Sequence, residues 1–117
     1  MNRTEEVNLM SEEYRSKRWY KHFDEIDREI ARAAVSCKVA LLDPGVIERV
    51  IKNDTSVCGA QNERAFTKLR SLLMMHYSAR ERAVVALGEA QTLAIMNDIV
   101  ARLRERLGDK LGGSPAA

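Results

Sequence analysis

The feature that most constrains this sequence is a run of apolar residues whose spacing alternates between four and three positions. The run consists of Trp19, Phe23, Ile26, Ile30, Ala33, Cys37 and Ala40. This is the a/d pattern of a helix that buries one narrow stripe against a partner helix. A single helix gains most of its stability from burying such a stripe, so the seam, as we call these residues, predicts a protein built from paired helices.

Composition agrees with an all-helical domain. The chain has 117 residues, only 5% of them aromatic, with two prolines and six glycines. This length favours one domain that buries a core of its own. A low content of aromatic residues and proline favours helices over sheets. The net charge of +2 is too small to mark a nucleic-acid-binding protein by itself.

The expected cellular location follows from two further features of the sequence. Its longest apolar run, residues 83–87, is far shorter than the roughly 20 residues that span a membrane, and the N-terminal residues do not have the pattern of a signal peptide. Cys37 and Cys58 are too few for a secreted disulfide scaffold. We therefore predict a cytoplasmic protein that makes no membrane contact.

Capping and helix-breaking residues predict four helices. The first is expected over residues 12–42, after a cap at Ser11 and before Asp43-Pro44, and the second over 44–52. Asn62 is expected to cap a third helix over 62–77. Ser78 and Glu81 fit a capping box, which favours a break there and a fourth helix over 79–107, although Gly88 is a rival break.

These elements predict an all-α, four-helix bundle-like domain with two long helices and two shorter ones. We expect the first and last helices to pair antiparallel. Residues 1–10 are expected to be a flexible arm, 11–108 the helical domain and 109–117, which contain Gly112, Gly113 and Pro115, a disordered tail.

A basic segment, residues 15–22, is the densest cluster of cations in the chain. It contains Arg15, Lys17, Arg18 and Lys21, next to Tyr14, Trp19 and Tyr20. Cations interleaved with aromatic rings can neutralise phosphates and stack on bases. Acidic residues follow immediately, which fits an ordinary solvated helix face equally well.

His76 and Cys58 are the remaining candidates for chemistry. His76 lies on the apolar face of the third helix, as a hydrogen-bonded core residue or as a ligand in the bundle interior. No histidine or cysteine pair has metal-ligand spacing, so we predict neither a metal nor a cofactor. Cys58 precedes a helix N-terminus, where a thiol can be reactive, but no base lies near it in the sequence.

The sequence as a whole predicts a small helical protein-protein interaction or regulatory protein. The seam favours a homodimer that also contacts another protein. Because no catalytic motif is present, we do not expect an enzyme. The alternatives are a nucleic-acid-binding helical protein that uses the basic segment and, third, a metal- or cofactor-binding bundle around His76.

Overall fold

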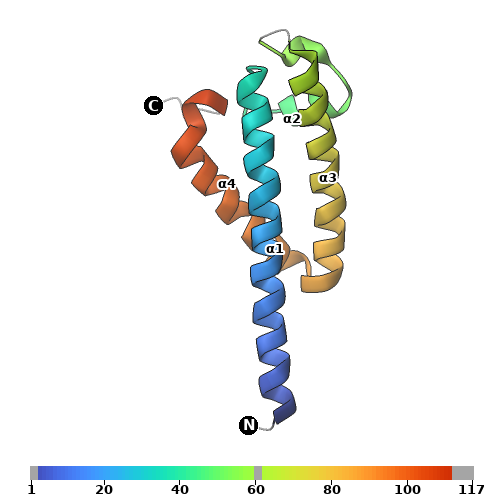
Figure 1. Ribbon diagram of the computed structural model, residues 1–117, viewed down its shortest axis with the longest axis vertical. Coiled ribbons are helices and arrows are strands. Elements are labelled where there is room, and N and C mark those ends of the chain that lie inside the picture. Colours follow the sequence, from blue (N-terminus) through green and yellow to red (C-terminus); the bar gives the residue numbers. More distant parts are fainter. Residues whose placement is uncertain (1–2, 60–61, 112–117) are drawn as a thin grey trace.

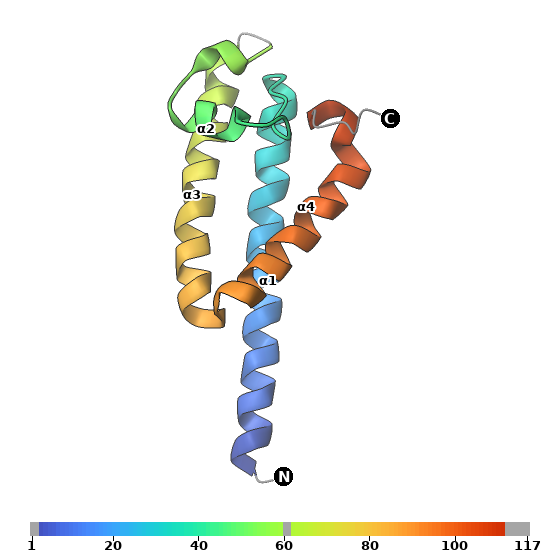
Figure 2. The same ribbon diagram turned by 180° about the vertical axis from the view of Figure 1, so that it is seen from behind.

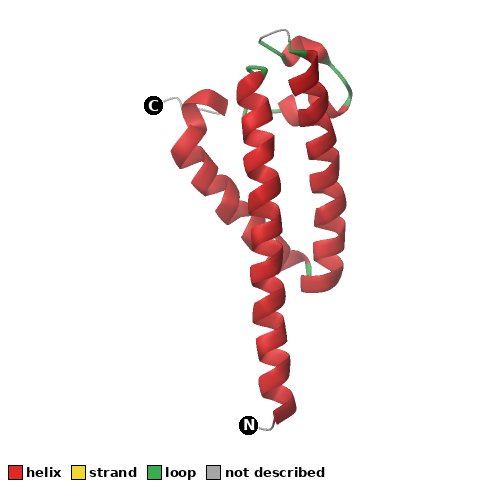
Figure 3. Ribbon diagram, in the orientation of Figure 1, coloured by secondary structure: helices red, strands yellow, loops and turns green. Residues whose placement is uncertain are grey.

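The computed structural model describes residues 3–59 and 62–111, and within them all side chains except those of residues 3–12 and 109. Four α-helices follow one another in the chain: α1 (Arg3–Ser36), α2 (Val46–Ile51), α3 (Glu63–Leu87) and α4 (Glu89–Leu111). A short 3-10 turn, η1 (Thr55–Val57), precedes α3. Figure 3 shows helices joined by short loops and no strand in this part of the chain. The predicted all-α, bundle-like fold is confirmed.

The three long helices share one core but not one direction. In Figure 1, α1 runs upward, α3 returns beside it, and α4 then crosses obliquely and diverges from α1 toward its C-terminal end. The view from behind in Figure 2 shows the same divergence. The predicted antiparallel pairing of the first and last helices is therefore wrong, because α3 is the antiparallel partner of α1.

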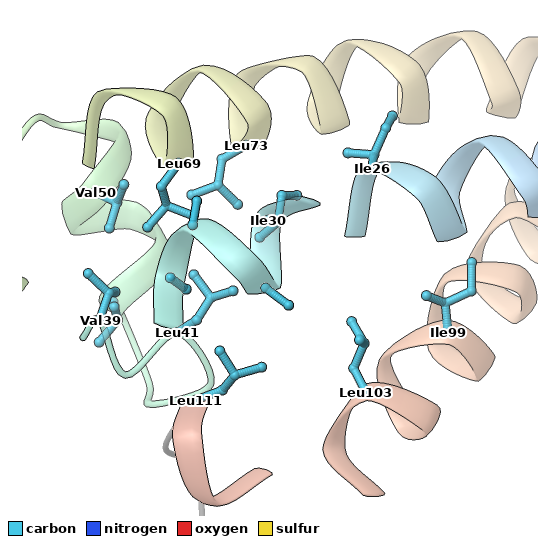
Figure 4. Close-up of a cluster of buried hydrophobic side chains, with 14 of the residues drawn as sticks. Ile26, Ile30, Val39, Leu41, Val50, Leu69, Leu73, Ile99, Leu103 and Leu111 are labelled. Carbon is cyan, nitrogen blue, oxygen red and sulfur yellow. The ribbon is translucent and has the colours of Figure 1, made fainter. Parts of the chain in front are cut away.

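The core gathers at the end of the molecule where α1, α2 and α3 meet the C-terminus of α4. Figure 4 shows its large aliphatic side chains pointing toward one another: Ile26, Ile30, Val39, Leu41, Val50, Leu69, Leu73, Ile99, Leu103 and Leu111. Each of these residues is buried. They come from every α-helix and from the loop after α1, so the tertiary fold depends on all of these elements together.

The first helix ends at Ser36, six residues before the predicted end at Leu42. Lys38 adopts a left-handed backbone conformation with φ 51°. The Val39 amide donates to the Ala34 carbonyl at 2.9 Å and the Lys38 amide donates to the Val35 carbonyl at 3.2 Å. This pair of bonds is the Schellman motif, which usually has glycine at the left-handed position. A lysine there gave no sequence signal.

The second helix is shorter than predicted at its start. Gly45, not Asp43, precedes it, with φ 78°, and the helix begins at Val46 rather than at Pro44. By contrast, the predicted cap of α3 is confirmed, because the Asn62 side chain accepts a hydrogen bond from the Ala65 amide at 3.0 Å.

The predicted break at Ser78 is also wrong, and the rival break at Gly88 is observed. Helix α3 continues through Ser78 to Leu87, and Gly88 has φ 88° and ψ 160°. Only glycine adopts this conformation readily. The Gly88 amide still caps α3 through the Val84 carbonyl, and its own carbonyl accepts from the Thr92 hydroxyl at 2.8 Å. A capping box at Ser78 is a weak signal beside a backbone position that requires glycine.

The chain ends are more helical than predicted. Residues 3–10 of the expected arm belong to α1. Helix α4 passes Gly108 and reaches Leu111, which is buried and whose carbonyl accepts from the Leu42 amide at 2.9 Å. This burial outweighs the roughly 1 kcal/mol helix penalty of a glycine. The rest of the expected tail, 112–117, lies outside the described residues.

The N-terminal part of α1 extends beyond the ends of α3 and α4, as Figures 1 and 2 both show. At about 1.5 Å per residue, a helix of 34 residues is nearly as long as the molecule's 59 Å long axis. Toward the N-terminus, the last side-chain hydrogen bond between α1 and another helix joins Gln91 to Ser16 among the described side chains. We call residues 3–15 the projecting segment.

Candidate functional site

The seam predicted from the sequence lies in the interior of the single chain. Five of its members, Phe23, Ile26, Ile30, Ala33 and Cys37, are buried, whereas Trp19 and Ala40 are partly exposed. Cys37 and Ala40 lie beyond the end of α1. Helices α3 and α4 contact α1 within the chain, so the stripe already has a partner without a second copy.

A buried carboxylate interrupts this apolar face. Asp27 is 6% exposed, and its Oδ1 lies 3.2 Å from Nε2 of His76 on α3, within ion-pair distance. The imidazole also packs against Phe23, with 5.4 Å between the ring centroids. A buried carboxylate is costly unless it has a polar partner, so the position of His76 on the apolar face of its helix is explained by its contact with Asp27.

Sequence reasoning identified His76 but missed Asp27. A usable signal was present, because Asp27 follows Phe23 by four positions and precedes Ile30 by three, the same spacing as the seam. A carboxylate at such a position predicts a buried polar partner on the facing helix.

A cavity of about 240 Å³ opens beside this pair, between α1, α3 and the diverging α4. Its lining is mainly aliphatic and includes Ile30, Leu73, Met96, Val100, Leu103 and Leu111. Four charged or titratable side chains also line it: Asp27, His76, Tyr77 and Arg80. An apolar hollow with a few convergent polar groups has the usual composition of a small-molecule site.

Arg80 is the arginine of the cavity lining, one turn beyond His76 on α3. It is half-buried, and it forms no ion pair with any side chain that the structure describes. Since Asp27 is paired with His76, Arg80 is the charged lining residue that has no ion-pair partner among the described side chains. No local sequence pattern predicts this position of Arg80, because the cavity arises from the angle of α4.

The basic segment lies on the surface of α1. Arg15, Lys17, Arg18 and Lys21 are all exposed, and none forms an ion pair within the described part of the chain. These four cations are therefore accessible to a nucleic acid or to an acidic protein surface.

The three aromatic residues beside those cations have different environments. Tyr14 is 67% exposed, whereas Trp19 packs against the core. The Tyr20 hydroxyl donates to Asp98 Oδ2 on α4 at 2.6 Å, and Arg102 lies over its ring. The hydrogen bond to Asp98, with desolvation, raises the pKa of Tyr20. Of these three residues, Tyr14 has the most exposed ring and is the one available for contact with another molecule.

The two cysteines lie together at the end of α1. The Cys58 thiol donates to the Cys37 carbonyl at 2.9 Å, next to an antiparallel bridge between Val39 and Cys58. Burial, and secondarily the neighbouring Cys58 thiol, raise the pKa of Cys37 to about 11. A thiol with a raised pKa is a poor nucleophile at neutral pH, so Cys37 behaves as a core residue.

No group of three or more histidine, cysteine, aspartate or glutamate side chains is arranged to hold a metal ion among the described residues. Within the same part of the chain, no helix has the length and apolar character that crossing a membrane requires. Comparisons with protein-family models, with curated proteins and with solved structures find no match to this chain.

Proposed function

We propose that this protein is a small helical protein-protein interaction or regulatory protein that acts as a homodimer through the projecting segment of α1. The supporting observation is the projection itself, since residues 3–15 continue α1 beyond the other helices. An isolated helix of this length is marginal in water and needs a partner to persist. Because the seam is covered within the chain, the dimer contact belongs to this segment.

The residue pattern of the projecting segment suits a helical partner. Val7, Met10 and Tyr14 have the three-and-four spacing of a coiled coil in the sequence, and Tyr14 is the most exposed tyrosine at 67%. Tyrosine is enriched at protein interfaces, where its ring is buried and its hydroxyl meets water. A second helix laid along this stripe would cover it.

Between residues 5 and 21 of α1 the charges fall into two blocks, which favours one direction of pairing. The first block is acidic: Glu5, Glu6, Glu12 and Glu13. The second is basic: Arg15, Lys17, Arg18 and Lys21. Antiparallel pairing of two α1 helices brings the acidic block of one opposite the basic block of the other, whereas parallel pairing sets like charges together. We therefore propose an antiparallel homodimer.

The solution mass of the full chain tests this proposal, and charge reversal sharpens it. One variant carries lysine at the four acidic positions, and a second carries glutamate at the four basic positions. We expect the natural chain to have twice the mass of a single chain in light scattering. Each variant alone should be monomeric because of self-repulsion, and an equimolar mixture should restore the dimer.

A control variant reverses charges away from the segment, at Arg82 and Arg104, which are exposed on α3 and α4. It should remain dimeric. If the natural chain has the mass of a single chain at every concentration, or if the mixture of the two variants stays monomeric, the proposal fails.

Nucleic-acid binding is the second candidate, favoured by the exposure of the four cations and by their lack of ion pairs in the described structure. A single-stranded oligonucleotide should then bind with an affinity that falls steeply as salt rises. The variant with glutamate at the basic positions should lose this binding. An affinity independent of salt would exclude this function.

We place the proposed dimer in the cytoplasm, where it would contact a further protein. Both cysteines are thiols, which suits a reducing compartment. Labelling of Cys37 and Cys58 in freshly lysed cells tests this location, because a secreted protein would carry them oxidised.

A further inference from the structure

We infer that the cavity between α1, α3 and α4 binds a small unbranched monocarboxylate of about eight carbons. This site is separate from the projecting segment, so the inference is independent of the proposed dimer. It stands on the size of the cavity, on its apolar lining and on the charge of Arg80.

The size of the ligand follows from the volume. A dry cavity of about 150 Å³ lined by aliphatic side chains holds one benzene molecule. By proportion, the 240 Å³ here accommodates about ten non-hydrogen atoms, the size of octanoate. The aliphatic lining from Ile30, Leu73 and Met96 favours a hydrocarbon chain over a sugar or a nucleotide, whose hydroxyls would find few partners.

The charge of the ligand follows from the polar groups at the cavity wall. Asp27 is already paired with His76, whereas Arg80 has no ion-pair partner among the described side chains. A guanidinium binds a carboxylate through two parallel hydrogen bonds. An ammonium ligand would instead be repelled by Arg80. The wall therefore selects an anionic head group.

The shape of the fold explains why the cavity is present. Helix α4 diverges from α1 toward its C-terminal end (Figures 1 and 2), while Leu42 holds the last residue of α4 through a backbone hydrogen bond of 2.9 Å to Leu111. Figure 4 shows Ile30, Leu73, Leu103 and Leu111 approaching from three sides. A ligand between these side chains would bridge α3 and α4, so its binding stabilises the folded chain.

The first experiment is a titration of the full chain with three eight-carbon probes: octanoate, octan-1-ol and octylammonium. Calorimetry gives the affinities, and amide chemical shifts locate the site. We expect octanoate to bind about tenfold or more tightly than the alcohol because of the charge-assisted hydrogen bonds to Arg80, with octylammonium the weakest. Shifts should concentrate around His76, Met96 and Val100. Failure of octanoate to bind, or equal affinity for the alcohol, overturns the inference.

Two variants and one control test the assignment to this cavity. Arg80→Gln should weaken octanoate by about tenfold or more without changing the affinity for octan-1-ol. Met96→Trp should fill the cavity and abolish binding of both probes. Arg82→Gln, an exposed arginine on the same helix, should leave the affinity unchanged.

An equal loss of octanoate affinity in Arg80→Gln and Arg82→Gln would mean non-specific attraction and would overturn the inference. If Met96→Trp does not fold, as judged by circular dichroism, Arg80→Gln still decides the outcome, because Arg80 is half-buried and makes no ion pair with the described side chains whose loss would unfold the chain. The solution mass of each variant is measured as well. It reports on the proposed dimer, whereas the octanoate affinity reports on the cavity, so the two proposals can fail independently.

Discussion

The two parts of α1 differ in how their side chains are covered, although they form one continuous helix. The embedded part, residues 19–36, buries Phe23, Ile26 and Ile30 against the rest of the chain. The projecting segment, residues 3–15, ends in Glu13, Tyr14 and Arg15, whose side chains are exposed. Periodic apolar residues predict that a helix face will be covered, but they do not say by which chain. The contrast therefore divides α1 into a part that stabilises the fold and a part available for interaction.

Truncating one ring in each part is the strongest test of this contrast. Phe23→Ala leaves a cavity in the fully buried core and should reduce the free energy of unfolding by about 3–5 kcal/mol. Tyr14→Ala, in the projecting segment, should change the free energy of unfolding of the monomer by less than about 0.5 kcal/mol. Urea denaturation at low protein concentration measures both. Equal losses would show that α1 is not divided in this way.

The next test concerns the polar contact inside the embedded part. Asp27→Ala removes the buried polar partner of the His76 imidazole and should cost about 2–3 kcal/mol, because it leaves a polar side chain without its partner in the core. In a double-mutant cycle with His76→Ala, the two losses should not add. Additive losses would mean that the contact contributes no coupling energy.

Sequence reasoning recovered what depends on local pattern. The seam spacing correctly predicted a long helix with a buried face, and Asn62 was correctly identified as a cap. The end of α1 was not predicted correctly, because a lysine in the left-handed conformation, Lys38, has no distinctive local sequence signal. The passage of α4 through Gly108 also escaped it, because the compensating burial of Leu111 is a tertiary contact.

The candidate site was less accessible to such reasoning. His76 was identified as an unusual residue on an apolar face, and its partner Asp27 had a detectable spacing. No sequence pattern indicated Arg80 or the cavity, because the cavity depends on the oblique course of α4 rather than on the sequence near Arg80. Local periodicity fixes which face of a helix is buried, but not the angle at which two helices cross.

Gly88 forms the turn between α3 and α4. Just after this turn, Gln91 of α4 contacts Ser16 of α1, so the turn lies near the boundary between the two parts of α1. Gly88→Ala forces a side chain into a backbone conformation with φ 88° and should cost about 1–2 kcal/mol. Gly108→Ala is the matched control, since nothing lies within 4 Å of the added carbon in helix α4. It should instead stabilise the fold by up to about 1 kcal/mol. Thermal unfolding of both variants measures these opposite changes, and a loss in both would place the constraint elsewhere.

The smallest expected effect is at the boundary between the two parts, where the Tyr20 hydroxyl donates to Asp98. Tyr20→Phe should reduce the free energy of unfolding by about 0.5–1 kcal/mol at neutral pH. The hydrogen bond to Asp98 raises the pKa of Tyr20 in the folded chain. Its contribution is therefore complete below the ordinary tyrosine pKa of about 10 and is lost as pH rises through the higher folded value. Denaturation of both chains from neutral to alkaline pH should show their difference vanishing in that window. A difference that stays constant there would mean that ring packing, rather than the hydroxyl, joins α1 to α4 at this boundary.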